Sequence, residues 1–279
     1  MKFKIVADSS SNVYGLSDVA YSSVPLKILS SNEEYIDTAD LNVSDMVAHL
    51  KAEKTAATTS CPNMMEWSDA FEDAENVFAL AITSQLSGAY NAALQAAGDF
   101  KRNHPDRRIW VLDTLSTGPE MQLLIEKLQE CIVAGGTFEE IRSAARDYHR
   151  HTHLLFALQS MENLAKNGRC SMAVAKVAGV LGIRVVGRAS AHGTLEPLAK
   201  PRGEQKALEA ILNEMARGGF KGGKVRIAHC FNLKSAESLR QMIFDCFPGS
   251  DIQITECGGL CSYYADLGGL LVGYEDGLN

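Results

Sequence analysis

Two short stretches rich in hydroxyl side chains stand where helices are expected to begin. TSQLSGAY (83–90) follows a strand-sized apolar run, and ATTSCPN (57–63) precedes a second helical pattern. In an α/β sheet the carboxyl ends of the strands face helix N-termini, whose unpaired N–H groups and positive dipole end attract anions. Ser84 and Ser87 offer hydroxyl donors, and Gly88 allows a ligand to approach the backbone closely. The pattern predicts a site for an anionic group.

The same hydroxyls could instead be ordinary helix N-caps, a role that Ser and Thr fill for stability alone. Pro62 stands at a suitable first helical position behind Thr59 and Ser60. The chain contains no G-x-x-x-x-G-K-[S/T] loop, and no G-x-G-x-x-G follows its first predicted strand. Without a phosphate-binding lysine or a metal motif, a carboxylate is easier to hold here than a triphosphate.

Two further groups of side chains could form a metal site or an acid/base pair, but a structural role explains each of them better. His149, His151 and His153 have a spacing that could hold zinc, yet polar residues commonly cluster at a junction between a helix and a strand. We therefore expect no metal and no cofactor. Asp8 and Asp113 both end apolar runs, and an aspartate at that position more often caps a turn than acts as an acid or base.

Composition limits the class of protein. The 279 residues carry a formal charge of −7 with no dense Lys/Arg run, which argues against nucleic acid as the main partner. The apolar runs are strand-sized, so we expect neither a signal peptide nor stable membrane insertion. The seven cysteines are odd in number and scattered, which indicates free thiols in a reducing compartment. These features predict a soluble cytoplasmic protein.

The order of strand and helix patterns predicts two α/β domains. Over 1–150, short apolar runs end in Asp, Ser or Thr before each helix, as expected for βα units and a largely parallel sheet. Over 151–279 the patterns become mixed, and the His192–Gly193 step between two strand-like runs predicts a hairpin and antiparallel pairing. No linker sequence marks the expected domain boundary near residue 150.

A run of motifs gives the chain a family resemblance. In order they are VADSSSN, VPLKILSSNEEYID, TTSCPN, TSQLSGAYNAA, VLDTLSTG and MENLAKNGRCS. The chain resembles the DegV family, bacterial fatty-acid-binding proteins that include the FakB subunits of fatty acid kinase. The resemblance implies a two-domain fold that encloses one long-chain fatty acid between its domains. It also implies that a separate ATP-dependent kinase subunit phosphorylates the acyl carboxylate, so that this chain is a carrier and not itself an enzyme.

The family motifs carry over a set of head-group residues. The resemblance places the carboxylate against hydroxyls and backbone N–H groups, and the tail in an apolar tunnel. The implied ligand-binding residues are Thr59, Ser60, Ser84, Ser87, Gly88 and Arg169.

One segment departs from the family pattern. ITECGGLCSYYADLGGLLVGY (254–274) stands in place of a segment with a carboxylate-contacting histidine, and Glu256 falls near that position. Because a glutamate repels a bound carboxylate unless one of the two is protonated, Glu256 either points away or changes the head group that is bound. The alternative hypothesis is therefore a small-molecule enzyme, or a protein for another ligand, that uses Glu256 in the cleft of the same fold.

Overall fold

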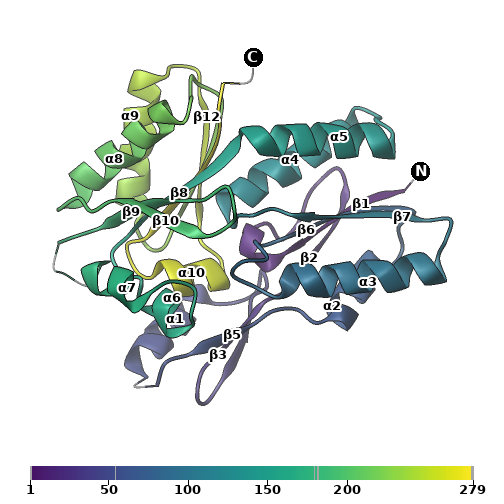
Figure 1. The fold of residues 1–279 in the computed structure, drawn as a ribbon, viewed down its shortest axis with the longest axis horizontal. Coiled ribbons are helices and arrows are strands. Elements are labelled where there is room, and N and C mark those ends of the chain that lie inside the picture. The colour runs from purple at the N-terminus through teal and green to yellow at the C-terminus, as the bar shows by residue number, and fades with distance from the viewer. Residues whose placement is uncertain (1, 54, 179, 181, 278–279) are drawn as a thin grey trace.

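The first half of the chain builds a parallel sheet, as predicted (Figure 1). The computed structural model describes positions 2–53, 55–178, 180 and 182–277. The four-stranded sheet has the order β2-β1-β6-β7, and every neighbouring pair is parallel. Its strands are β1 (Phe3–Asp8), β2 (Ala20–Val24), β6 (Asn76–Ala81) and β7 (Arg108–Asp113). All six residues of β6 are buried, as expected for a central strand covered on both faces.

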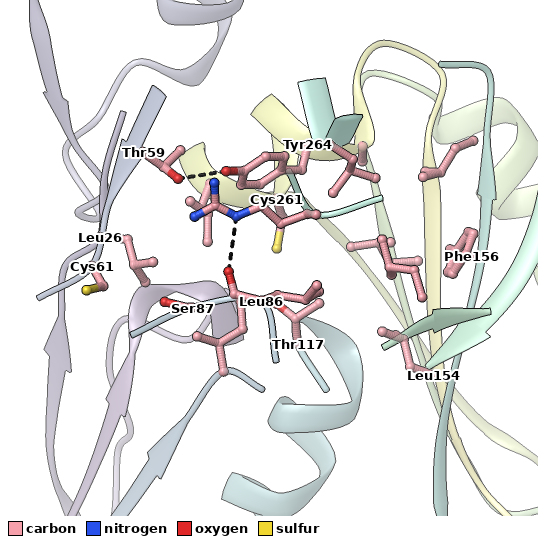
Figure 2. A pocket seen from close by; sticks show the side chains of 18 of the residues that line it. Leu26, Thr59, Cys61, Leu86, Ser87, Thr117, Leu154, Phe156, Cys261 and Tyr264 are labelled. Atoms are coloured by element: carbon pink, nitrogen blue, oxygen red, sulfur yellow. Dashed lines mark hydrogen bonds between the residues drawn. The ribbon is translucent and has the colours of Figure 1, made fainter. Parts of the chain in front are cut away.

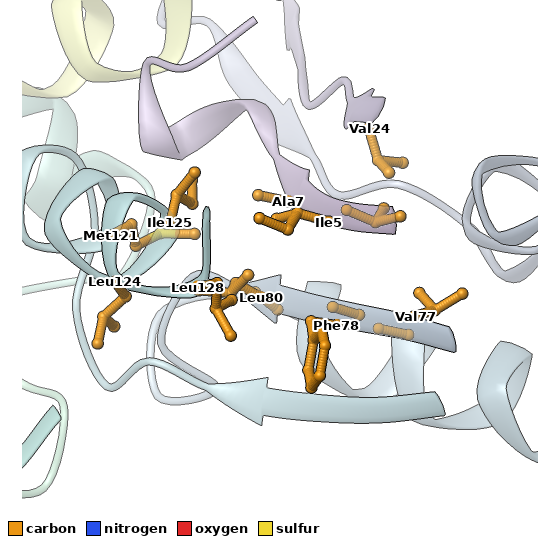
Figure 3. Packing of buried hydrophobic residues seen from close by; sticks show 14 of the residues in the cluster. Ile5, Ala7, Val24, Val77, Phe78, Leu80, Met121, Leu124, Ile125 and Leu128 are labelled. Carbon is orange, nitrogen blue, oxygen red and sulfur yellow. The ribbon is translucent and has the colours of Figure 1, made fainter. Parts of the chain in front are cut away.

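Helices cover both faces of this sheet (Figure 1). On one face lie α2 (Met64–Phe71) and α3 (Ala89–Asn103), and on the other lie α4 (Pro119–Val133) and α5 (Phe138–Tyr148). Figure 3 shows the apolar side of α4, with Met121, Ile125 and Leu128, packed near side chains of β1 and β6. A short 3-10 helix, η1 (Ser9–Ser11), follows β1 directly.

A small antiparallel sheet with the order β4-β3-β5 lies beside the parallel one. It consists of β3 (Lys27–Leu29), β4 (Glu34–Ile36) and β5 (Thr58–Ser60), and α1 (Val43–Ala52) connects β4 to β5. The prediction that Pro62 begins a helix capped by Thr59 and Ser60 is wrong. Asn63 is the N-cap of α2, because its side chain accepts from the Glu66 N–H while the Glu66 carboxylate accepts from the Asn63 N–H.

The second half forms a six-stranded mixed sheet with the order β10-β9-β8-β13-β11-β12. Only the β11–β12 pair is parallel, and the predicted hairpin at His192–Gly193 is confirmed as the β9–β10 connection. The strands are β8 (Thr152–Leu158), β9 (Val185–Ala189), β10 (Leu195–Ala199), β11 (Lys224–His229), β12 (Asp251–Glu256) and β13 (Leu270–Glu275). The helices are η2 (His149–His151), α6 (Glu162–Lys166), α7 (Met172–Ala178), α8 (Glu204–Arg217), α9 (Leu233–Cys246) and α10 (Gly259–Ala265).

Helix α4 joins the two halves through a buried ion pair. It packs against β13, β11 and β8 as well as against β1 and β6. Arg226 of β11 donates from Nε and Nη2 to the two carboxylate oxygens of Glu126, each at 2.7 Å, and from Nη2 to Asp251 at 2.9 Å. The Arg226 side chain is only 3% exposed, so its charge depends on these partners.

Helix α10 also joins the halves, but it belongs to the second half and packs against the first. It comes from the C-terminal part of the chain, yet it packs against η1, β3 and α1 of the first half, and Figure 1 shows it next to α6 and below β9 and β10. The buried carboxylate of Asp37 accepts from the N–H groups of Gly259 and Leu260 at 2.7 and 3.1 Å, and from the Tyr14 hydroxyl at 2.9 Å. Burial raises the pKa of Asp37, and these donors offset part of that rise.

Replacing Glu126 with alanine tests the link made by α4. The change leaves the buried Arg226 guanidinium with the Asp251 carboxylate and two backbone carbonyls, and we expect a loss of about 3 kcal/mol in the free energy of unfolding. Urea denaturation followed by circular dichroism measures this. Glu237→Ala, which removes an exposed pair with Arg240, is the control and should cost less than about 1 kcal/mol. Equal losses in the two variants would contradict the assignment.

Replacing Asp37 with alanine tests the link made by α10. The N–H groups of Gly259 and Leu260 lose a buried acceptor, and we expect the free energy of unfolding to fall by about 2 kcal/mol or more. Asp37→Asn keeps one carbonyl oxygen and should lie between the alanine variant and the unmodified chain. Asp40→Ala, a nearby exposed carboxylate, should change stability by less than about 0.5 kcal/mol. An Asp37→Ala variant as stable as Asp40→Ala would remove this role.

Candidate functional site

A cavity of about 310 Å³ lies where the carboxyl end of the parallel sheet meets the six-stranded sheet. This volume is at the lower end of the range for small-molecule sites, about 300–1,000 Å³. The lining combines a few hydroxyls with many aliphatic side chains and comes from both halves of the chain. It consists of Leu26, Thr59, Ser60, Cys61, Ile82, Leu86, Ser87, Gly88, Thr117, Leu154, Phe156, Leu158, Leu164, Arg169, Leu195, Leu260, Cys261, Tyr264, Ala265 and Leu271.

The polar groups gather at one end of the cavity (Figure 2). The Thr59 hydroxyl on β5 lies 2.6 Å from the Tyr264 hydroxyl on α10, and either can be the donor. Ser87 stands just before α3, and its Oγ accepts from the Ala89 N–H at 3.2 Å. Arg169 follows α6 and donates from Nε to the Leu86 carbonyl at 3.1 Å. Four separate parts of the chain therefore bring polar groups to one place.

The loop that carries Ser87 is fixed by the parallel sheet beneath it. Asp113, at the end of β7, accepts from the N–H groups of Ser84 and Leu115, both at 3.1 Å. Asp8, at the end of β1, accepts from the Ile82 N–H at 2.7 Å and from the Ser10 N–H at 3.1 Å. Burial raises the pKa of Asp8 to about 6. Both aspartates thus cap turns, as the sequence predicted.

The other end of the cavity is apolar. Leu154, Phe156 and Leu158 alternate along β8 and point to one face of the six-stranded sheet, where Leu271 of β13 pairs with Phe156. Leu195 adds to the wall from the start of β10. Figure 2 shows Leu154 and Phe156 on the side opposite Thr59 and Ser87. The cavity is therefore amphipathic along its length.

One charged side chain faces this cavity. Among the described lining residues, Arg169 alone carries a formal charge. Burial raises the pKa of the Tyr264 phenol, with Thr59 and Arg169 lowering it in part, and burial raises the pKa of the Cys261 thiol to about 12. Both groups are protonated at neutral pH, so the polar end offers donors and one cation, a combination suited to an anion.

Most of the sequence-predicted site residues meet at this polar end. Thr59, Ser60, Ser87, Gly88 and Arg169 all line the cavity.

Ser84 and Glu256 are placed elsewhere. Ser84 directs its Oγ toward the Gln85 amide, and Glu256 is exposed at the end of β12, an edge strand, where it pairs with His229 of β11. Neither belongs to the described lining, and their part in ligand binding stays a prediction.

Sequence reasoning missed Tyr264. The available signal was the pair of tyrosines in SYYADLGG, but tyrosines beside a glycine-rich turn more often serve packing. Only the fold brings α10 against β5, so that the Tyr264 hydroxyl reaches Thr59.

The histidine-rich stretch lies away from the cavity. His149 Nε2 lies 2.8 Å from the Thr114 carbonyl, while His151 and His153 both contact the Asp276 carboxylate, at 2.9 and 3.1 Å. Within the described ranges, no group of three or more His, Cys, Asp or Glu side chains is arranged to hold a metal ion. Among these same residues, no helix has the length and apolar character needed to cross a bilayer.

Comparison with known proteins gives one family. Residues 2–275 match a family model described as "Uncharacterised protein, DegV family". A DegV domain-containing protein of Streptococcus pneumoniae is 41% identical over 99% of both chains.

The fold is also shared with solved structures. The Streptococcus pneumoniae fatty acid kinase (Fak) B3 protein, solved loaded with linoleic acid, superposes with a TM-score of 0.97 at 41% identity and 99% coverage of both chains. A DegV family protein of Eubacterium eligens, loaded with heptadecanoic acid, gives 0.96 at 39% identity, covering 98% of this chain and 99% of that one. With the family model matching nearly the whole sequence, the chain belongs to the DegV family.

Proposed function

We propose that this protein is a fatty-acid-binding carrier that encloses one long-chain fatty acid between its two halves. The amphipathic cavity carries the proposal, because it joins a donor-rich end to an aliphatic wall. The carboxylate lies against Thr59, Ser87, Tyr264 and Arg169, and the tail lies along the leucines of the six-stranded sheet. Two relatives near 40% identity, which were solved with linoleic and heptadecanoic acid, support this ligand class.

The two ends of the cavity contribute differently to binding. Each buried methylene contributes about 0.8 kcal/mol, so a long tail supplies most of the affinity. The head-group donors offset the cost of burying a carboxylate, which is large when the charge has no partners. Arg169 supplies a compensating charge, and the neutral hydroxyls fix the orientation of the carboxyl group.

We further propose that the carrier supplies no chemistry and presents the bound carboxylate to a separate ATP-dependent fatty acid kinase subunit. The described lining holds donors and thiols but no carboxylate or histidine that could act as a general base. The name of the Streptococcus pneumoniae relative, a B protein of fatty acid kinase, supports a kinase partner. We also propose a cytoplasmic location, where such a kinase would find ATP.

The double variant Thr59→Ala with Ser87→Ala tests the head-group assignment. Two hydrogen bonds to a charged group contribute about 3 kcal/mol together, so we expect linoleic acid affinity to fall roughly a hundredfold. Isothermal titration calorimetry of linoleic acid binding to the delipidated protein measures the change in affinity.

Two hydroxyls outside the cavity provide the control for this variant. Thr55→Ala with Ser238→Ala removes exposed hydroxyls and should leave affinity unchanged. Unchanged binding in the Thr59/Ser87 variant would place the carboxylate elsewhere.

The proposal that a separate kinase phosphorylates the bound carboxylate is tested by following acyl phosphate formation. The loaded protein incubated with ATP and Mg²⁺ should form no acyl phosphate. Addition of a fatty acid kinase catalytic subunit should start its formation, because the proposal assigns ATP binding to that subunit. Trapping with hydroxylamine as the hydroxamate, read by mass spectrometry, measures the product. Formation of acyl phosphate by this chain alone would contradict the carrier role.

A further inference from the structure

The tip of the β9–β10 hairpin contacts the loop that carries Ser87. Gly193 at the tip is buried, although its neighbours His192 and Thr194 are exposed. The Thr83 hydroxyl donates to the Gly193 carbonyl at 2.8 Å, in a contact that joins residues from the two halves of the chain. The hairpin therefore does not simply project into solvent.

This contact leaves room for glycine alone. Gly193 has φ of +80°, and a Cβ built on it would lie 2.2 Å from the Thr83 hydroxyl oxygen and 3.2 Å from Leu115 Cα. A side chain here would strain the backbone and push the hairpin away from the loop. Glycine at this position therefore allows the hairpin tip to lie against Thr83 and Leu115.

Thr83 uses all its polar atoms to shape the loop. Its N–H donates to the Ser116 carbonyl at 2.9 Å, and its own carbonyl accepts from the N–H groups of Leu86 and Ser87, both at 3.2 Å. Its hydroxyl oxygen also accepts from the Gln85 N–H at 3.3 Å. A shift of Thr83 would therefore move Ser87 at the polar end of the cavity.

The same hairpin also contacts the apolar part of the cavity. Leu195, two residues after Gly193, lines the wall, and β9 pairs with β8, which carries Leu154 and Phe156. A ligand that packs on Leu195 thus contacts the β9–β10 hairpin, which also bonds to Thr83 through Gly193. Contacts with the tail and with the head group converge on one hairpin.

We infer that Thr83 and Gly193 are positioning residues, which hold the Ser87 loop in the geometry for a carboxylate only when the hairpin is seated on it. This inference rests on the proposed function and adds a role to residues that do not touch the ligand. It makes head-group selectivity depend on a hydrogen bond between the hairpin and the loop.

The test compares two ligands with one tail, linoleic acid and linoleyl alcohol, in Thr83→Val. Valine keeps the shape of threonine but can neither donate to the Gly193 carbonyl nor accept from the Gln85 N–H. The hairpin then no longer holds the loop, and we expect Ser87 to shift although the backbone bonds of Thr83 remain. We expect acid affinity to fall about fivefold to tenfold, as for the loss of one hydrogen bond, and alcohol affinity to stay within about twofold. Thr83→Ser restores the hydroxyl and should restore acid affinity.

Thr194→Val is the matched control. It is the same substitution in the same hairpin, but the Thr194 hydroxyl bonds to Ser190 within the turn, so the ratio of acid to alcohol affinity should not change. Equal weakening of both ligands in Thr83→Val, or of neither, would overturn the inference. Failure of the unmodified chain to bind linoleic acid would instead overturn the proposed function itself.

Discussion

A carboxylate can lie beneath a protein surface only where several hydrogen-bond donors converge on it, because an unpaired buried charge is costly. In this chain the donors that meet at the cavity belong to distant parts of the sequence. Thr59 comes from the small sheet, Ser87 from the start of α3, Arg169 from the end of α6 and Tyr264 from α10. The proposed function therefore depends on holding both halves of the molecule in one arrangement.

The rest of the structure supplies that arrangement. Arg226 and Glu126 fix α4 to the six-stranded sheet, and Asp37 fixes the start of α10 to the first half. Thr83 and Gly193 add a third contact directly beside the polar end. Each contact pairs a buried polar group from one half with a partner from the other, so misplacing the halves would leave these groups unsatisfied.

Much of the fold could be predicted from the sequence. Five of the expected site residues, Thr59, Ser60, Ser87, Gly88 and Arg169, line the cavity, and their binding of a head group stays a prediction. Strands ending in Asp8 and Asp113 predicted a parallel sheet with a loop site at its carboxyl end, because βα units place such residues at one edge. Local patterns failed at Pro62, where the capping box of Asn63 and Glu66 decides the start of the helix. They also missed Tyr264, since only packing between distant segments brings α10 against β5. The part of Glu256 in ligand binding stays a prediction, and its exposed place on β12 comes from pairing with β11.

The most direct test of the central claim is to identify what the protein carries. Freshly purified protein would be denatured and extracted with organic solvent, and the extract quantified by mass spectrometry. If the cavity encloses one ligand with a tail long enough to supply the affinity, about one equivalent of a long-chain fatty acid per chain is expected. A folded protein that yields no fatty acid, and that does not bind added fatty acids after delipidation, would contradict the fatty-acid-binding function.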